Sequence, residues 1–234
     1  ETGMTKTMEG KICDSQCSYV LGLEYGLMEN CDAAKMHLLR KTRERNHTVG
    51  TGFFGTGLLN QALSNMGADE DAYKLMLQTG FPSWLYPVTQ GATTIWEHWD
   101  GMKDDGSMWS ADMNSFNHYA YGAIGEWMYR AMAGIEADPE HPGFKHAILY
   151  PRIGGNLKYT VGKYHSIYGD VGVKWEVQGK QITLTVQIPV NTTTEIRLDK
   201  AKAVLESDGL TFTREADYMA AEAGSGTYHI AFEQ

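Results

Sequence analysis

The spacing of apolar residues changes near residue 141, and this change limits the chain to a fold with two kinds of secondary structure. Before that point apolar residues recur every three or four positions, as over 15–29, which is typical of helices. After it they alternate with polar residues, as over 182–188, which is typical of half-buried strands. We therefore expect an α+β multidomain protein, with a helical domain over 1–140 and an antiparallel β-sandwich over 141–234.

Five helices are expected in the first part, over 15–29, 32–45, 57–66, 69–79 and from Ser115 to about Gly134. Asp32 is expected to cap the second helix and Ser115 the last, because short polar side chains accept hydrogen bonds from free N–H groups. The expected buried stripes are Tyr19, Leu23 and Leu27 in the first helix, and Met36, Leu38 and Leu39 in the second. The pattern over 81–114 predicts a long connection, a length that is unusual unless the segment has a function.

Short strands separated by turn residues are expected in the second part. Val171, Val173, Trp175 and Val177 alternate with other residues in the way that 182–188 does, and 178–180 reads as the turn between them. Further strands are expected over 193–198, 203–206, 210–214 and 227–232. Asp208-Gly209 is a hairpin signal. Six to eight such strands favour a sandwich.

The charge of the 234 residues excludes several classes of partner. A net charge of −9 argues against nucleic acids and anionic membrane surfaces. The sequence contains no apolar run of the roughly 20 residues that span a bilayer and no visible secretory signal, which slightly favours the cytoplasm.

Three cysteines form neither a disulfide framework nor a zinc pattern. We expect no metal or other cofactor, since Asp100, Asp104, Asp105 and Asp112 lack the spacing of a metal-binding loop.

The window from Trp84 to His118 contains four of the six tryptophans, and Glu97 lies in it between Trp96 and Trp99. A sugar pocket needs flat rings that stack on C–H faces and a carboxylic acid or carboxylate that acts on the glycosidic bond. The alternative is that the tryptophans are ordinary core and that Glu97 is solvated. The residues alone leave these two interpretations open.

Four segments of the first part resemble the C-terminal part of bacterial alpha-L-rhamnosidases, glycoside hydrolase family 78. They are 51–56 (TGFFGT), 82–86 (PSWLY), 91–99 (GATTIWEHW) and 113–120 (MNSFNHYA). The resemblance implies that the helices are the second half of an (α/α)6 catalytic barrel and that the strands are the β-sandwich that follows it. It also implies an inverting hydrolysis that releases terminal alpha-L-rhamnose from a glycoside or polysaccharide.

The same resemblance assigns residues to the site. Glu97 matches the general base, which deprotonates water on one face of the sugar while an acid protonates the leaving oxygen on the other. His118 matches a histidine that contacts sugar hydroxyls, and in the first turn of the expected helix it would be neutral because the helix dipole disfavours a cation there. Further substrate-binding candidates are Trp84, Trp96, Trp99 and Asn117.

The chain departs from the family in one large respect. Residues 1–50 contain no counterpart of the acidic segment that carries the family's general acid, and the pattern predicts about five helices where a complete barrel has twelve. We therefore expect a C-terminal fragment that is inactive alone and whose exposed helix faces favour self-association or a protein partner. The alternatives are a non-catalytic module that binds carbohydrate or protein through the sandwich or the helices, and another (α/α)-barrel glycosidase or lyase.

Overall fold

The computed structural model describes residues 13–112 and 114–234, so Met113 of the fourth motif and the start of the predicted helical domain lie outside it. Contacts divide the chain into two compact units, one that ends at Gly125 and one that begins at Glu126. The second unit therefore includes residues 126–140 together with the sandwich. The predicted domain boundary at 140/141 stays a prediction.

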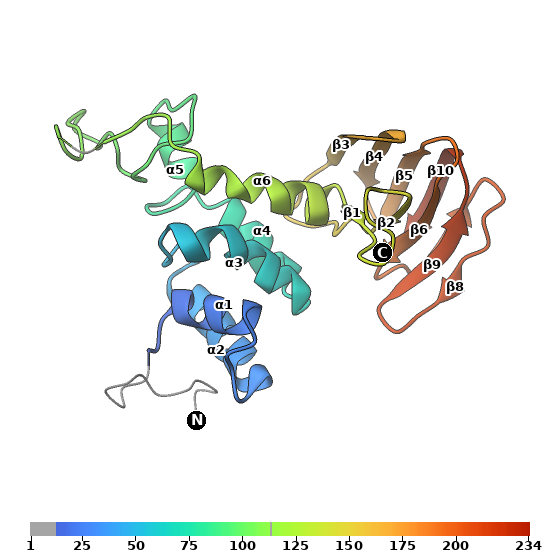
Figure 1. The fold of residues 1–234 in the computed structure, drawn as a ribbon, viewed down its shortest axis with the longest axis horizontal. Helices are drawn as coiled ribbons and strands as arrows, with labels where there is room; N and C mark the ends of the chain where they lie inside the picture. The colour runs from blue at the N-terminus through green and yellow to red at the C-terminus, as the bar shows by residue number, and fades with distance from the viewer. Residues whose placement is uncertain (1–12, 113) are drawn as a thin grey trace. The chain divides into compact units, whose positions relative to one another are not determined.

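The first unit is helical (Figure 1). Its α-helices are α1 (Gln16–Glu24), α2 (Cys31–Glu44), α3 (Phe53–Asn65), α4 (Asp69–Met76) and the short α5 (Leu85–Thr89). The unit also contains the 3-10 turn η1 (Ala120–Ala123) and the beginning of α6 (Ile124–Trp127), which the π-helical turn η2 (Met128–Met132) follows. Helix α3 packs against α1, α4 and η1, and its fully buried side chains include Leu59 and Leu63.

The start of α2 and two buried positions differ from the prediction. Asn30, and not Asp32, caps α2, because its side chain accepts a hydrogen bond from the N–H of Ala33, and Asp32 lies in the first turn. Leu38 is fully buried as expected, but Met36 is 73% exposed and Leu27, which follows α1, is 62% exposed. The apolar periodicity therefore located the helices but overestimated the width of their buried faces.

The last helix begins later than predicted. Ser115 does not cap it, because the helical turns start at Ala120. The backbone from Ser115 to His118 instead pairs with an earlier segment: Glu97 N–H donates to Ser115 O at 2.8 Å, and His118 N–H donates to Ile95 O at 2.8 Å. The Ser115 carbonyl, which would accept the first intrahelical bond of a helix capped by Ser115, is therefore bonded to Glu97 instead.

The second unit contains two five-stranded sheets (Figure 1). One has the order β1-β2-β6-β9-β8, with β1 (Ile135–Ala137), β2 (His146–Leu149), β6 (Thr193–Asp199), β9 (Tyr218–Ala223) and β8 (Thr213–Arg214). The other has the order β3-β4-β5-β10-β7, with β3 (Tyr159–Ser166), β4 (Gly169–Gln178), β5 (Gln181–Ile188), β10 (Gly226–Glu233) and β7 (Ala203–Glu206). All neighbours are antiparallel except β2 and β6, which are parallel.

Both sheets contribute to one buried core. Trp175 of β4 is fully buried in it, and its indole N–H donates to the carbonyl of Met132 at 2.8 Å. The predicted alternation along β5 is confirmed, since Ile182, Leu184, Val186 and Ile188 are all buried. The predicted helical part followed by a β-sandwich is likewise confirmed.

The hairpin predicted at Asp208-Gly209 is wrong. Both residues have the positive φ angles of a turn, 46° and 83°, but the strands on either side belong to different sheets. Strand β7 pairs with β10, and β8 pairs with β9. Because the Asp208 carboxylate accepts the backbone N–H of His229 at 2.7 Å, the turn is held against β10.

Candidate functional site

Two segments that lie about twenty residues apart in the sequence form the centre of the candidate site. Besides the two backbone hydrogen bonds of Glu97 and His118, the Thr94 hydroxyl donates to the carbonyl of Phe116. The two segments therefore run side by side. Their hydrogen bonds form one short ladder that includes both Glu97 and His118. Glu97 and His118 are both half-buried, so each is open to solvent in part.

A cluster of aromatic rings stands beside this ladder. The Trp99 ring stacks on Tyr121 with a centroid distance of 3.8 Å and meets Trp84 edge-on at 5.6 Å. The Trp84 indole N–H donates to the carbonyl of Tyr121 at 2.9 Å. Stacked and edge-on rings of this kind hold one another in fixed orientations.

Phe53 connects the ring cluster to His118. Its ring stacks on the His118 imidazole at 4.8 Å and 16°, and it lies 5.0 Å from the Tyr121 ring. Neither Phe53 nor Tyr121 was among the predicted site residues. Phe53 does lie in the TGFFGT motif, so that segment was the signal that could have identified it.

The charge of Glu97 reaches this cluster. Burial raises the pKa of the Tyr121 hydroxyl above its ordinary value, and the negative charge of Glu97 raises it further. An effect of this kind requires the carboxylate to lie near the phenol, since charge–charge interactions fall with distance and are screened by water. Glu97, Tyr121, Phe53 and His118 therefore belong to one neighbourhood.

The imidazole of His118 has a definite hydrogen-bonding role. It lies two residues before η1 and not in a helical turn, so the helix-dipole reason for a neutral ring is wrong. The N–H of Ala120 lies 3.4 Å from His118 Nδ1 and donates to it, so Nδ1 faces the chain.

The remaining predicted substrate contacts differ in exposure. Trp84 and Trp96 are each 6% exposed, and Trp96 meets Phe116 edge-on at 5.0 Å, so little of either indole is free for a sugar. Trp99 is half-buried and Asn117 is exposed, and the Asn117 backbone N–H donates to the Ser115 hydroxyl. All four stay predictions as substrate contacts, with Trp99 and Asn117 the more accessible.

His98 and the nearby aspartates have local roles. The His98 ring stacks on Trp109 at 3.7 Å, and the Asp104 carboxylate accepts the Tyr86 hydroxyl at 2.9 Å. Over 13–112 and 114–234, no group of three histidine, cysteine or acidic side chains could hold a metal ion. In the same ranges no helix has both the length and the apolar character needed to cross a membrane.

Curated proteins similar to this chain are alpha-L-rhamnosidases. One from Streptomyces avermitilis is 38% identical over 228 residues, which is 95% of this chain and 22% of that protein. One from Formosa agariphila is 39% identical over 211 residues, which is 87% of this chain and 22% of that protein. The chain thus spans about a fifth of the length of the curated relatives that it matches.

Solved structures agree. The crystal structure of the Streptomyces avermitilis alpha-L-rhamnosidase complexed with L-rhamnose matches 97% of this chain and 22% of that chain, at a TM-score of 0.88 and 36% identity. The structure of an alpha-L-rhamnosidase from Dictyoglumus thermophilum matches 94% of this chain and 25% of that chain, at a TM-score of 0.84 and 27% identity. These matches confirm the fold class predicted from the sequence.

Family models divide the chain into two consecutive parts. Residues 4–132 match the bacterial alpha-L-rhamnosidase 6 hairpin glycosidase domain, and residues 134–212 match the bacterial alpha-L-rhamnosidase C-terminal domain. The resemblance inferred from the four motifs is confirmed. Since the first match alone covers more than half of the 234 residues, the chain belongs to the bacterial alpha-L-rhamnosidase family.

Proposed function

We propose that this chain carries the general-base part of an inverting alpha-L-rhamnosidase site, with Glu97 as the base and His118 as a contact to sugar hydroxyls. The observation that carries the proposal is the backbone ladder between 95–97 and 115–118, which holds the two side chains in one place beside Phe53 and Tyr121. Membership of the family and the similarity to an enzyme crystallised with L-rhamnose support the choice of sugar.

The chemistry assigns one proton transfer to this chain. The Glu97 carboxylate takes a proton from a water molecule as the water oxygen attacks the anomeric carbon, and the leaving oxygen departs from the opposite face. Inversion requires room for that water, which corresponds to about 6.5–9.5 Å between the two carboxyl groups. Because His118 Nδ1 accepts the Ala120 N–H, Nε2 is the ring nitrogen that would bond a rhamnose hydroxyl, and the half-buried Trp99 ring would provide an apolar wall.

A second part of the proposal concerns the activity of the isolated chain. We expect no measurable rhamnosidase activity from the 234 residues by themselves, because no general acid is assigned in them. Loss of one acid–base partner typically costs about 10²–10⁴-fold in rate. Loss of substrate positioning by the rest of the barrel wall adds to that cost.

A chimaera tests the proposal. This chain replaces the matching 228-residue segment of the Streptomyces avermitilis relative, and turnover of an aryl alpha-L-rhamnoside is compared with that of the isolated chain. The chimaera should hydrolyse the rhamnoside, Glu97→Gln should reduce kcat by about 10²–10⁴-fold, and the exposed Asp112→Asn in the same window should leave it unchanged. NMR of the first-formed sugar should give the inverted anomer.

Three results would contradict separate parts of the proposal. Turnover by the isolated chain would contradict its inactivity. Full activity of the Glu97→Gln chimaera would remove Glu97 as the base. A first product with retained configuration would replace the inverting mechanism by a covalent one.

We also propose that the isolated chain self-associates through apolar residues of its helical unit. Phe54 is 87% exposed and Met36 is 73% exposed, and large apolar side chains in such positions favour association. Light scattering over a concentration series should give a mass above that of the 26.1 kDa monomer, and Phe54→Ser should lower it. A strict monomer at the highest concentration would exclude this proposal.

A further inference from the structure

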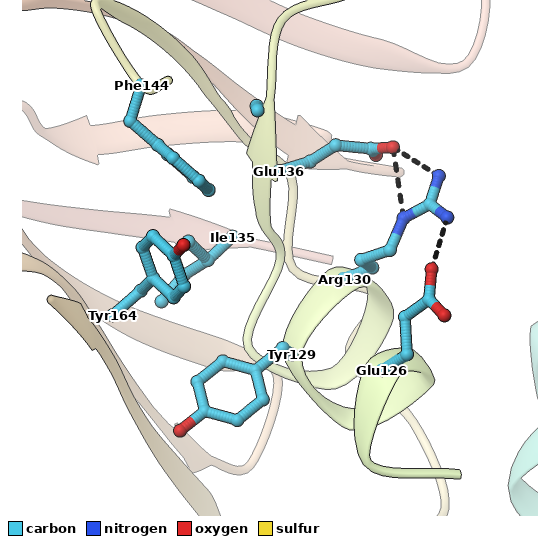
Figure 2. Close-up of a pocket in the computed structure, with 8 residues that line it drawn as sticks. Glu126, Tyr129, Arg130, Ile135, Glu136, Phe144 and Tyr164 are labelled. Carbon is cyan, nitrogen blue, oxygen red and sulfur yellow. Dashed lines mark hydrogen bonds and ion pairs between the residues drawn. The ribbon is translucent and has the colours of Figure 1, made fainter. Parts of the chain in front are cut away.

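The second unit contains a pocket that the proposed rhamnosidase site does not use. Its volume is about 620 Å³, and its walls come from the end of the last helix, strand β1, the loop before β2, and strand β3. Figure 2 shows aromatic side chains on one side of it and a group of charged side chains on the other. Pockets that bind small molecules have this size and this mixture of a large apolar wall and a few polar groups.

Three rings form the apolar side. Phe144 and Tyr164 lie with their centroids 4.4 Å apart and their planes 31° apart, so together they make one bent surface (Figure 2). Tyr129 lies next to them on the turn η2. Tyr164 is 42% exposed and Tyr129 is 47% exposed, which leaves much of their surface open to a ligand.

Arg130 lies between two carboxylates on the polar side. Its Nη1 donates to Glu126 at 2.9 Å and its Nε donates to Glu136 at 3.1 Å (Figure 2). A guanidinium has five N–H groups and each carboxylate has several lone pairs, so the three side chains can offer both donors and acceptors to a bound molecule. Their combined charge is −1.

Two local backbone features support a binding role for this pocket. Phe144 has a φ angle of 67°, an unusual left-handed conformation for a large side chain. Tyr129 and Arg130 lie on η2, a π-helical turn, a form that is rare and frequent at functional sites. Residues held in uncommon conformations cluster at ligand-binding sites, where the surrounding structure keeps them in place.

We propose that this pocket binds a neutral saccharide, with a pyranose ring stacked on Tyr164 and Phe144 and its hydroxyls bonded to Arg130 and Glu136. A sugar combines an apolar C–H face with hydroxyl groups that donate and accept, which matches the two sides of the pocket. Anions are disfavoured by the net negative charge, and a cation would meet the Arg130 guanidinium. A wholly apolar ligand would leave without partners those N–H groups and lone pairs that the three charged side chains do not use among themselves.

The inference does not depend on the assignment of Glu97. Every residue of the pocket belongs to the second unit, whereas Glu97 and His118 belong to the first. Binding here would give the chain a sugar contact that involves no hydrolysis. It would also persist when the proposed general base is removed.

An NMR titration of the whole 234-residue chain tests the inference. The probes are the methyl glycosides of alpha-L-rhamnose, alpha-D-glucose and beta-D-galactose, with tetramethylammonium and inorganic phosphate as charged alternatives. We expect at least one glycoside to shift the amide signals of the pocket, including that of Ala137. Tyr164→Ala should weaken its binding by about tenfold, the loss expected for one stacked ring.

Matched variants separate the pocket from its surroundings. Tyr159 lies on the same strand, is 66% exposed and does not line the pocket, so Tyr159→Ala should bind the glycoside as the unmodified chain does. Glu97→Gln should also leave this binding unchanged. If Tyr164→Ala loses the amide pattern of the folded sandwich, Tyr129→Ala on the helical side replaces it and should give a similar loss.

Several outcomes would overturn the proposal. They are the absence of pocket shifts with all three glycosides, shifts only with tetramethylammonium or phosphate, and equal binding by the Tyr159→Ala and Tyr164→Ala variants. Glycoside shifts confined to residues around Glu97 would also overturn it. That last result would leave the proposed rhamnosidase site intact, so failure of the two proposals can be distinguished.

Discussion

Replacement of Asp71 should destabilise the helical unit by an amount that depends on pH. Asp71 lies in α4 and is 5% exposed. Its two carboxylate oxygens accept hydrogen bonds from Nε and Nη2 of Arg43 at 2.9 and 2.8 Å. His47 Nε2 lies 2.8 Å from the carboxylate oxygen Oδ1. These contacts connect α4 to the end of α2 and to the residues that follow it, so Asp71→Asn removes a connection between helices.

The magnitude follows from the pKa of Asp71. Hydrogen bonds and charge interactions with the Arg43 guanidinium, and to a smaller extent with His47, lower it from 3.8 to about 2 against the opposing effect of burial. Because one pKa unit corresponds to about 1.4 kcal/mol, the charged carboxylate stabilises the folded unit by roughly 2 kcal/mol. A depressed folded-state pKa makes this contribution complete well above pH 3.8. It is lost as the pH falls towards about 2, with about half remaining near pH 3.

Urea unfolding, followed through the amide signals of α4, measures the effect at about pH 7 and pH 3. Asp71→Asn should cost about 2 kcal/mol at the higher pH and about half as much at the lower one. Glu70→Gln, at the neighbouring position of α4, is the matched control, because the Glu70–Lys74 pair is exposed and screened. The reasoning would be refuted if Asp71→Asn lowered the free energy of unfolding by no more than Glu70→Gln does. It would also be refuted if the decrease for Asp71→Asn were the same at both pH values.

Three further results are expected. Glu97→Gln should lower the pKa of Tyr121, which stays above its ordinary value because the phenol remains buried. NMR titration of the tyrosine ring carbons measures this pKa, and an unchanged value would show that the Glu97 charge does not act on Tyr121. Trp175→Ala should destabilise the sandwich by about 3–5 kcal/mol in urea unfolding, since the indole is fully buried, and a loss below about 1 kcal/mol would contradict its place in the core. Gly134→Ala should destabilise by more than about 1 kcal/mol, because φ is 72° and a Cβ would lie 2.0 Å from Pro151 N, whereas near-neutral stability would contradict that close approach.

The sequence predicted individual strands better than their partners. The alternation over 182–188 reports which side chains face the core, and that is a local property of an extended chain. Partner choice depends on residues far away in the sequence, and Asp208-Gly209 illustrates the difference. The dipeptide does form a turn, but its neighbours join different sheets, which no short pattern could indicate.

Prediction of the candidate site had the same limit. Glu97 and His118 were identified because they lie in motifs that resemble a known family. Phe53 also lies in one of these motifs, but its stacking partner is more than sixty positions away, and the part that Phe53 and Tyr121 play became visible as ring contacts. Sequence patterns therefore identified residues for the proposed chemistry and missed those that orient them.

The late start of the last helix follows from the arrangement of the proposed site. Ser115 is a good N-cap residue, and the positions after it have helical periodicity, so local preference favours a helix from that point. A helix capped by Ser115 would use the Ser115 carbonyl to accept its first intrahelical hydrogen bond, and this is the carbonyl that accepts the Glu97 N–H here. The pairing that overrides the local preference is thus the one that brings the proposed base and the sugar-contacting histidine together, as expected where local rules give way at functional sites.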